Sequence, residues 1–358
     1  MKKLKINTLS IITIGFACAG LSTQASAAPV LLPNAICDGS PTANCMKAND
    51  FNVFSLALLD LQNPSGGYKV SASPGQISPY TIIGQNNGQE GAGNLAGLVD
   101  GTYNTPSQNN ATNGTFSTVT SNPGGVADPK VGGGNGPGAG EFTGDSENSW
   151  DARVETIKQL TNNTPVVFFF SFNETGSGTG LLTTDLLIWG KVTLVSDTTN
   201  ASETFYLGGQ PAAGTTPLDS ALPDPTLANT DYSSPGYDYG DWIYVHAGIC
   251  VSNGQFVGFP NSQGACTVGQ SDYVQTNLGN DTAAFMINSP ELDAALLSGK
   301  YDTMQVTWEM AYINGGGESA WIAPVTTERQ VPEPGLLALT ALGLGALGWN
   351  SKRIAKRS

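Results

Sequence analysis

In the stretch Thr303-Met304-Gln305-Val306-Thr307-Trp308-Glu309-Met310-Ala311-Tyr312, large apolar side chains occupy every second position. Successive side chains of an extended strand point to opposite faces. The stretch therefore predicts a β-strand with two different faces. One face carries Met304, Val306, Trp308, Met310 and Tyr312 and packs on a core, and the other carries Gln305, Thr307 and Glu309.

Other stretches of the chain have similar strand signals, namely β-branched and aromatic residues bounded by Gly, Pro and Asn. They are Val166–Phe172, Leu186–Val195, Thr204–Leu207, Trp242–Val251, Gln255–Phe259 and Ser319–Val325, with shorter islands at Tyr80–Ile83 and Thr115–Thr120. Asn253-Gly254 is the dipeptide of a two-residue hairpin turn. Phe51 to Leu61 fits the helix and strand periods only in part, so its state stays open.

Two short helices are expected among these strands. Ser146–Leu160 places Trp150, Val154, Ile157 and Leu160 at helical spacing. Ser289-Pro290 precedes a helix over Glu291–Ser298, which Gly299 ends. Many short strands with Gly and Pro turns, and few helices, favour a mainly β ectodomain, an antiparallel β-sandwich of jelly-roll type.

Composition divides the chain into five parts. They are a leader over 1–27, an N-terminal segment over 28–61, a Gly/Asn/Pro-rich irregular β region over 62–149, a β-sandwich core with short helices over 150–330, and a tail over 331–358. The leader has basic residues at Lys2, Lys3 and Lys5, an apolar run from Ile11 to Leu21, and a small-residue cleavage site at Ala25-Ser26-Ala27. This order is that of a secretory signal peptide, so we expect export and a mature chain that starts at Ala28.

The exported part is strongly acidic. Of 15 Lys and Arg residues, three lie in the leader and four in the tail, which leaves 8; of 29 Asp and Glu residues, only Glu333 lies there, which leaves 28. The net charge of the ectodomain is therefore near −20. Such a charge disfavours nucleic acid as a partner. It also disfavours direct binding to anionic lipid or acidic polysaccharide, unless divalent cations bridge the surfaces.

Four cysteines follow the leader: Cys37, Cys45, Cys250 and Cys266. Three pairings are possible. Closeness in sequence favours Cys37 with Cys45 and Cys250 with Cys266, and an oxidising compartment outside the cytoplasm allows these bonds to form. Zinc binding is the alternative, but the spacings are unlike those of zinc pairs and the chain has one His.

The tail has three ordered elements. Pro332 and Pro334 flank Glu333 and block helix propagation, an uncharged apolar run follows from Gly335 to Trp349, and Lys352, Arg353, Lys356 and Arg357 close the chain. Apolar residues followed by cations predict a C-terminal hydrophobic helix held in a membrane with its basic end in the cytoplasm. Leu336–Trp349 would measure about 21 Å as a helix, against a bilayer core of ~30 Å. A buried core helix is therefore the alternative.

The tail closely resembles the C-terminal sorting signal of PEP-CTERM proteins, with Pro332, Glu333 and Pro334 as the matching motif. The resemblance covers residues 331–358. It implies recognition by an exosortase, a membrane-embedded processing enzyme. It also implies delivery through an inner-membrane intermediate to the surface or matrix of a Gram-negative, exopolysaccharide-producing bacterium.

No catalytic motif is present: the chain lacks a Gly-x-Ser-x-Gly elbow, His-Glu-x-x-His, a Walker loop and Gly-x-Gly-x-x-Gly. His246, its one His, is expected to be a packed or edge residue on the side of Trp242 and Tyr244. Glycosidase chemistry needs two carboxylates about 5–9 Å apart. The acids near aromatic residues are Asp151, Glu174, Asp241 and Glu309.

Two binding hypotheses rest on residues 231–242. Asp231, Asp238 and Asp241 offer oxygen ligands for Ca²⁺, but an Asx-rich turn is the favoured explanation, because the spacing lacks an EF-hand-like register. The neighbouring tyrosines and Trp242 could stack on sugar rings or pack in the core. We expect a non-catalytic structural or interaction protein associated with exopolysaccharide, with no required cofactor. A Ca²⁺-dependent glycan-binding module and a carbohydrate-active hydrolase are the alternatives.

Overall fold

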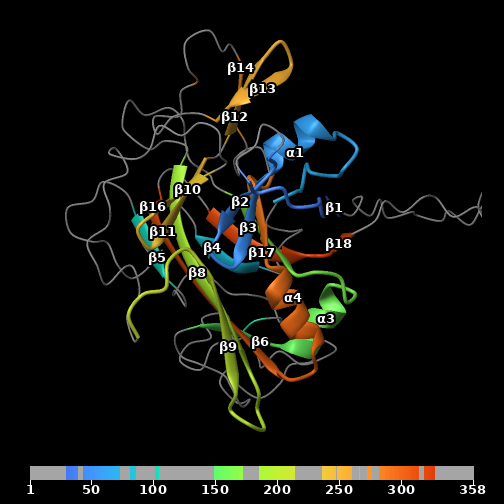
Figure 1. Cartoon of the computed structure of the whole chain (residues 1–358), viewed down its shortest axis with the longest axis vertical. Coiled ribbons are helices and arrows are strands. Elements are labelled where there is room, and N and C mark those ends of the chain that lie inside the picture. Colours follow the sequence, from blue (N-terminus) through green and yellow to red (C-terminus); the bar gives the residue numbers. More distant parts are fainter. Residues whose placement is uncertain are drawn as a thin grey trace, which may run out of the picture.

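The computed structural model describes thirteen segments of the chain, and the following account concerns these residues. They are 30–38, 43–72, 81–85, 101–104, 116, 149–171, 185–213, 236–246, 248–259, 266, 272–275, 282–313 and 318–326. Within them the chain is mainly β, with several antiparallel sheets and three short helices (Figure 1). The prediction of a mainly β protein is confirmed.

The larger sheet has seven strands and is centred on β16, Thr303–Ile313. Its order is β10 (Gly236–Tyr239), β11 (Trp242–His246), β8 (Asp185–Val195), β16 and β5 (Gly101–Asn104), while β6 (Trp150–Arg153) also pairs with β16 and β9 (Ser202–Leu207) with β8. β16 runs antiparallel to β8 from Thr303 opposite Val195 to Ala311 opposite Leu187. The strand predicted over residues 303–312 is therefore the middle of this sheet.

A second sheet has six strands. Its order is β2 (Met46–Ala48), β3 (Phe51–Ser55), β15 (Phe285–Asn288), β7 (Val167–Ser171), β17 (Glu318–Ala323) and β4 (Thr81–Gln85). Two smaller sheets accompany it. They are the parallel pair β1 (Val30–Leu31) with β18 (Val325–Thr326), and β13 (Gln255–Gly258), β12 (Gly248–Ser252) and β14 (Asp272–Gln275) in that order.

One hydrophobic core joins the inner faces of the two large sheets, and Trp308 lies at its centre. Its ring contacts Phe168 and Phe170 of the opposite sheet edge to face, with centroid distances of 5.3 and 5.2 Å. Gly190 of β8 is the residue opposite Trp308. A Cβ atom on Gly190 would lie 2.1 Å from the indole carbons. The missing side chain of Gly190 thus provides the room that the indole occupies.

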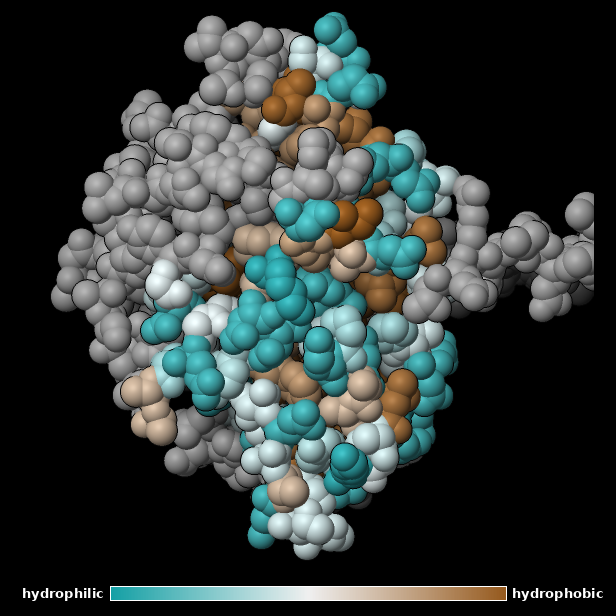
Figure 2. All heavy atoms as spheres, in the orientation of Figure 1, coloured by the Kyte–Doolittle hydropathy of each residue, from teal (hydrophilic) through white to brown (hydrophobic). Residues whose placement is uncertain are grey.

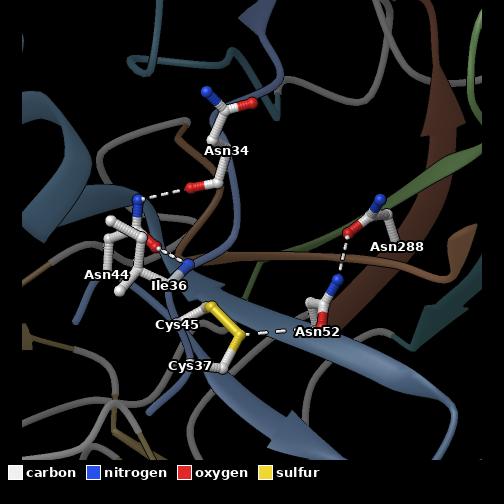
Figure 3. The surroundings of a disulfide bond; sticks show 7 residues. All are labelled: Asn34, Ile36, Cys37, Asn44, Cys45, Asn52 and Asn288. Carbon is white, nitrogen blue, oxygen red and sulfur yellow. Dashed lines mark hydrogen bonds between the residues drawn. A yellow bond between two sulfur atoms is a disulfide. The ribbon is translucent and has the colours of Figure 1, made fainter. Parts of the chain in front are cut away.

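The outer face of the six-stranded sheet is covered by the N-terminal segment and by α1, Leu56–Gln62. Figure 3 shows the disulfide that closes this segment, between Cys37 and Cys45. The Asn44 amide holds the enclosed loop, since its Oδ1 accepts from Ile36 N at 3.0 Å and its Nδ2 donates to Asn34 O at 3.0 Å. Beside the disulfide, the buried Asn52 amide donates to Asn288 Oδ1 at 3.3 Å across β3 and β15 (Figure 3).

The remaining helices pack on the core at the edge of the sheets. They are α3 (Val154–Leu160) and α4 (Pro290–Leu297). α4 begins as predicted, because Ser289 Oγ accepts from Leu292 N at 3.2 Å and Pro290 occupies the first turn. Gly299 follows with φ of 72°. The predicted hairpin turn is also confirmed, since Asn253 and Gly254 have φ of 51° and 72° between β12 and β13.

Three stretches differ from expectation. The run over 51–61, whose state the sequence leaves open, contains both a strand and a helix. Strand β3 ends at Ser55, whose hydroxyl accepts a hydrogen bond from Leu58 N and so caps α1. The helix predicted over 146–160 is wrong for its first part, because Trp150–Arg153 pairs with β16 and only Val154–Leu160 is helical. The single strand predicted over 242–251 is two strands in different sheets, β11 and β12. In each case pairing with distant strands overrides the local pattern.

Most of the predicted region 62–149, including Thr115–Thr120 apart from Phe116, lies outside the described residues, as do the leader and the tail. Among the helices of the described residues, none is long and apolar enough to cross a membrane. The hydrophobic helix predicted near 336–349 therefore stays a prediction.

We expect Gly190→Ala to destabilise the protein by about 1–3 kcal/mol, because the added methyl group overpacks the site of the Trp308 ring. Urea unfolding followed by circular dichroism measures this loss. The matched control is the same change in a Trp308→Leu background, where the smaller side chain removes the clash. An equal cost of Gly190→Ala in both backgrounds would show that the ring does not set the requirement for glycine.

Candidate functional site

The outer face of the seven-stranded sheet carries the candidate site. Strand alternation turns Met304, Val306, Trp308 and Met310 inward, so Gln305, Thr307 and Glu309 of β16 lie on the outer face. The cross-strand register places Thr193, Lys191 and Trp189 of β8 directly opposite these three residues. Thr204 and Tyr206 of β9 lie opposite Thr193 and Lys191 in turn. We call Lys191, Thr193, Thr204 and Tyr206 the β8–β9 strip.

The β8–β9 strip is half-buried and polar. Thr193 Oγ1 and Thr204 Oγ1 share a hydrogen bond of 3.0 Å. Next to them, Lys191 lies between Thr307 on one side and Tyr206 on the other. Within the described part of the chain, the Lys191 ammonium has neither a hydrogen bond nor an ion pair. The strip therefore presents a free cation beside a phenol ring and a hydroxyl pair.

The aromatic end of the strip is held firmly. The rings of Trp189 and Tyr206 lie 6.4 Å apart and are tilted by 45°. The Trp189 indole N–H donates to Gly209 O at 2.8 Å. Gly208, with φ of 90°, and Gly209 lie close against Asp241, where Gly209 N donates to Asp241 O at 2.9 Å. Trp189 is therefore buried beneath this glycine pair, and it supports the ring of Tyr206.

The turn between β2 and β3 fixes the backbone of Tyr206. Tyr206 N donates to Asp50 Oδ2 at 2.7 Å, and Asp50 N donates to Tyr206 O at 3.1 Å. Asn49, with φ of 52°, donates from its side chain to Gly208 O at 3.1 Å. These three bonds join the six-stranded sheet to the edge strand of the seven-stranded sheet. They fix the backbone of Tyr206, and the neighbouring Trp189 ring limits where the Tyr206 ring can lie; rigid elements are suited to recognition.

Two of the acids singled out from the sequence, Asp151 and Glu309, lie on this same face and are buried. The Ser149 hydroxyl donates to Asp151 Oδ1 at 2.6 Å. Asp151 is opposite Gln305, so it lies four positions from Glu309 along β16. At 3.3–3.4 Å per residue this places their Cα atoms roughly 13 Å apart.

The other predicted acids are dispersed. Asp241 lies in the turn before β11, and Asp238 lies in β10 opposite Ile243. Asp231 and Glu174 lie outside the described residues. Among the described residues, no group of three His, Cys, Asp or Glu side chains could hold a metal ion. His246 ends β11 opposite Asp185 of β8.

Both disulfides predicted from the sequence are confirmed, Cys37–Cys45 with a Cα–Cα distance of 4.7 Å and Cys250–Cys266 with 5.7 Å. The first closes the N-terminal cover and the second ties Cys266 to β12. The residues of the predicted leader and sorting signal lie outside the described part of the chain. They are Ala25, Ala27, Pro332, Glu333, Pro334, Lys352, Arg353, Lys356 and Arg357.

A second polar feature is a shallow cavity of about 50 Å³ between α3 and α4. Asp293 lines it and accepts a hydrogen bond from Val166 N at 2.7 Å. Burial raises the pKa of Asp293 to about 6, although the bond from Val166 opposes this shift. The cavity has room for only a few waters. Its carboxylate links α4 to the start of β7, which is a structural role.

Sequence reasoning did not single out Lys191, Tyr206 or Trp189. Each lies in a stretch predicted to be a strand or next to one, and the polar alternation of Lys191 and Thr193 within Leu186–Val195 marks an exposed face. The sequence alone does not show that β8 pairs with β9, or in which register. Only the register of β8 with β9 brings the ammonium beside the phenol.

This chain is a mainly β protein whose two large sheets share one core and whose outer sheet face carries a cation beside aromatic rings. It belongs to the family described as a domain of unknown function, DUF8239, whose model matches residues 30–309. No curated protein and no solved structure matches the chain.

We expect the charge of Asp293 to make folding stability depend on pH. Its pKa is about 6 in the folded protein and near 3.8 in an unfolded chain, so the folded state holds the proton more tightly. Stability should therefore fall as the pH rises from about 4 to about 6, by at most roughly 3 kcal/mol for this group. Asp293→Asn keeps an oxygen acceptor for Val166 N and removes this dependence.

Urea unfolding at a series of pH values tests the prediction. Asp293→Asn should be more stable than the natural protein at pH 7 and equal to it near pH 4. Glu291→Gln, a change on the exposed side of the same helix, should keep the pH profile of the natural protein. A natural protein and an Asp293→Asn variant with parallel profiles between pH 4 and 7 would contradict the assignment.

Proposed function

We propose that this protein is exported, sorted by an exosortase, and placed at the surface or in the extracellular matrix of a Gram-negative bacterium. Its role there is a non-catalytic structural or interaction role associated with exopolysaccharide. The β8–β9 strip carries this proposal, because a free ammonium, hydroxyl groups and a fixed phenol ring are groups that bind sugars by hydrogen bonds and ring contact.

The terminal segments support the proposed export and sorting. The leader and the tail have the order of a signal peptide and of a PEP-CTERM sorting signal. The family model matches 30–309, between these two segments. Two disulfides between close cysteines fit an oxidising compartment outside the cytoplasm. In this proposal the tail is an inner-membrane anchor before processing, and the folded part works outside.

We also infer that the two large sheets form a sandwich of jelly-roll type. Four antiparallel pairings support this inference, because each encloses the previous one in the sequence. They are β8 with β11, β7 with β15, β6 with β16, and β4 with β17. Successive pairings belong alternately to the seven-stranded and the six-stranded sheet. A long hairpin rolled over a core has this nesting.

The lack of a recognised catalytic motif in the sequence is the reason for proposing a non-catalytic role. Asp151 and Glu309 lie on one face, but the register separates them by about 13 Å along β16. The hydrolase thus stays the alternative with less support.

We expect Glu333→Ala and deletion of residues 331–358 to abolish normal sorting. Cells producing either variant should lose the processed, surface-located form that cells with the natural protein have, because the motif and the anchor are the features that the exosortase reads. Fractionation and mass spectrometry of the intact protein measure location and processing. Glu291→Ala, an exposed acid of α4, is the matched control and should be sorted normally.

Calorimetry with the exopolysaccharide of the producing bacterium, with and without Ca²⁺, tests the interaction itself. Heat of binding without Ca²⁺ is the expected result, since the β8–β9 strip needs no metal. Unchanged processing and location in both sorting variants would falsify the proposed sorting. An absence of binding heat in both conditions would remove the association with exopolysaccharide.

A further inference from the structure

We infer that the β8–β9 strip binds neutral pyranose residues of a polysaccharide, with Lys191 and Tyr206 as the contacts that determine affinity. This inference rests on the proposed function and adds the location of the site and the chemical class of the sugar. It is carried by the Lys191 ammonium, by the immobilised Tyr206 ring and by the charge of the ectodomain.

Lys191 is the first observation. The ectodomain has 8 cations against 28 acids, so a half-buried lysine without a carboxylate partner is unexpected. Among the other described cations, Lys69 pairs with Asp60 at 3.4 Å and Arg153 pairs with Asp197, while Lys47 and Lys300 are exposed to water. Lys158 is half-buried too, but it lies in the last turn of α3, where a cation is favourable.

Lys191 has no such role. It lies in the middle of β8, half-buried, and within the described residues it has no ion pair or hydrogen bond. Partial burial of the stem restricts where the ammonium can lie, so less conformational entropy is lost when a ligand oxygen accepts its N–H bonds. Three donors on one flexible stem suit the neighbouring hydroxyl groups of a sugar ring.

Tyr206 is the second observation. Its backbone is fixed by both bonds to Asp50, and its ring lies against the buried Trp189. Little conformational entropy would then be lost when a ligand contacts the ring. Among the described residues its hydroxyl group has no hydrogen-bond partner, so it is available to a ligand. A phenol offers both an apolar face and a polar end, which matches the apolar face and hydroxyl rim of a pyranose.

The surrounding surface excludes an apolar partner. On the face shown in Figure 2, the described residues are mainly hydrophilic or intermediate, and hydrophobic residues occur in small separate groups. The exposed large hydrophobic residues of the described chain are likewise scattered: Ile36, Val257 and Leu297 lie in the N-terminal loop, in β13 and in α4. Protein-binding patches are usually contiguous and apolar, so the strip fits a polar ligand better.

Net charge decides between neutral and acidic sugars. The β8–β9 strip has one ammonium, that of Lys191, and the ectodomain around it has a net charge near −20. An acidic polysaccharide chain would gain one ion pair at the strip and meet repulsion along the rest of the surface. A neutral chain has the hydrogen bonds and ring contact without that repulsion. Neutral sugars are therefore the class that the strip accepts.

The test uses the full chain exported in a Gram-negative host and purified from the envelope in mild detergent. The probes are the neutral and the uronate-rich fractions of the producing bacterium's exopolysaccharide, separated by anion exchange. Calorimetry should show binding of the neutral fraction. Lys191→Met should weaken it roughly tenfold or more and Tyr206→Ala roughly three- to tenfold, whereas Tyr206→Phe, which keeps the ring, should lose less.

Lys158→Met is the matched control, because Lys158 is a second half-buried lysine that lies away from the strip, and it should bind like the natural protein. Thermal unfolding checks that every variant is folded, and Lys191→Met conserves the length of the side chain. Normal binding by both Lys191→Met and Tyr206→Ala would overturn the site while leaving the association with exopolysaccharide intact. Preferential binding of the uronate-rich fraction would overturn the sugar class. A natural protein that binds neither fraction would overturn both this inference and the association with exopolysaccharide. The proposed export and sorting are tested separately by the sorting variants.

Discussion

The indole of Trp308 is the contact on which both large sheets depend. It reaches across the core to Phe168 and Phe170, and it fits because Gly190 leaves space on the neighbouring strand. This contact also fixes which face of β16 points inward. Since alternation is strict, the same choice turns Thr307 outward and places it opposite Lys191. A shift of one residue in β16 would bury the polar side chains and dismantle the β8–β9 strip.

Local signals in the sequence predicted a good part of this fold. Alternation from Thr303 to Tyr312, the Asn253-Gly254 turn and the Ser289 cap all act within a few residues, and so do the close cysteine pairs. Other features depend on partners far away in the chain. Trp150–Arg153 has helical spacing but pairs with β16. The β8–β9 strip can be recognised only once the pairing register of β8 with β9 is known. The hydrogen bond between Tyr206 N and Asp50 Oδ2 joins residues 156 positions apart. No periodicity encodes such contacts.

The site and the charge of the chain are consistent with each other. A strongly negative net charge favours solubility and disfavours unselective binding to nucleic acid or anionic surfaces. The half-buried cations are then informative, because Arg153 forms an ion pair and Lys158 lies at a helix end. Lys191 differs from these two, and it lies beside Tyr206, whose backbone is held by hydrogen bonds from the other large sheet.

The parallel pairing of β1 with β18 brings the two ends of the described fold together. Val30 lies opposite Val325, and Leu32 N donates to Thr326 O at 2.8 Å, so the first and last described strands leave the fold at one place (Figure 1). A tail that continues from Thr326 would suspend the globule from a single pivot. If the proposed tail were cut beyond this point, no strand of the described sheets would lose its partner. The released protein would then keep its described fold.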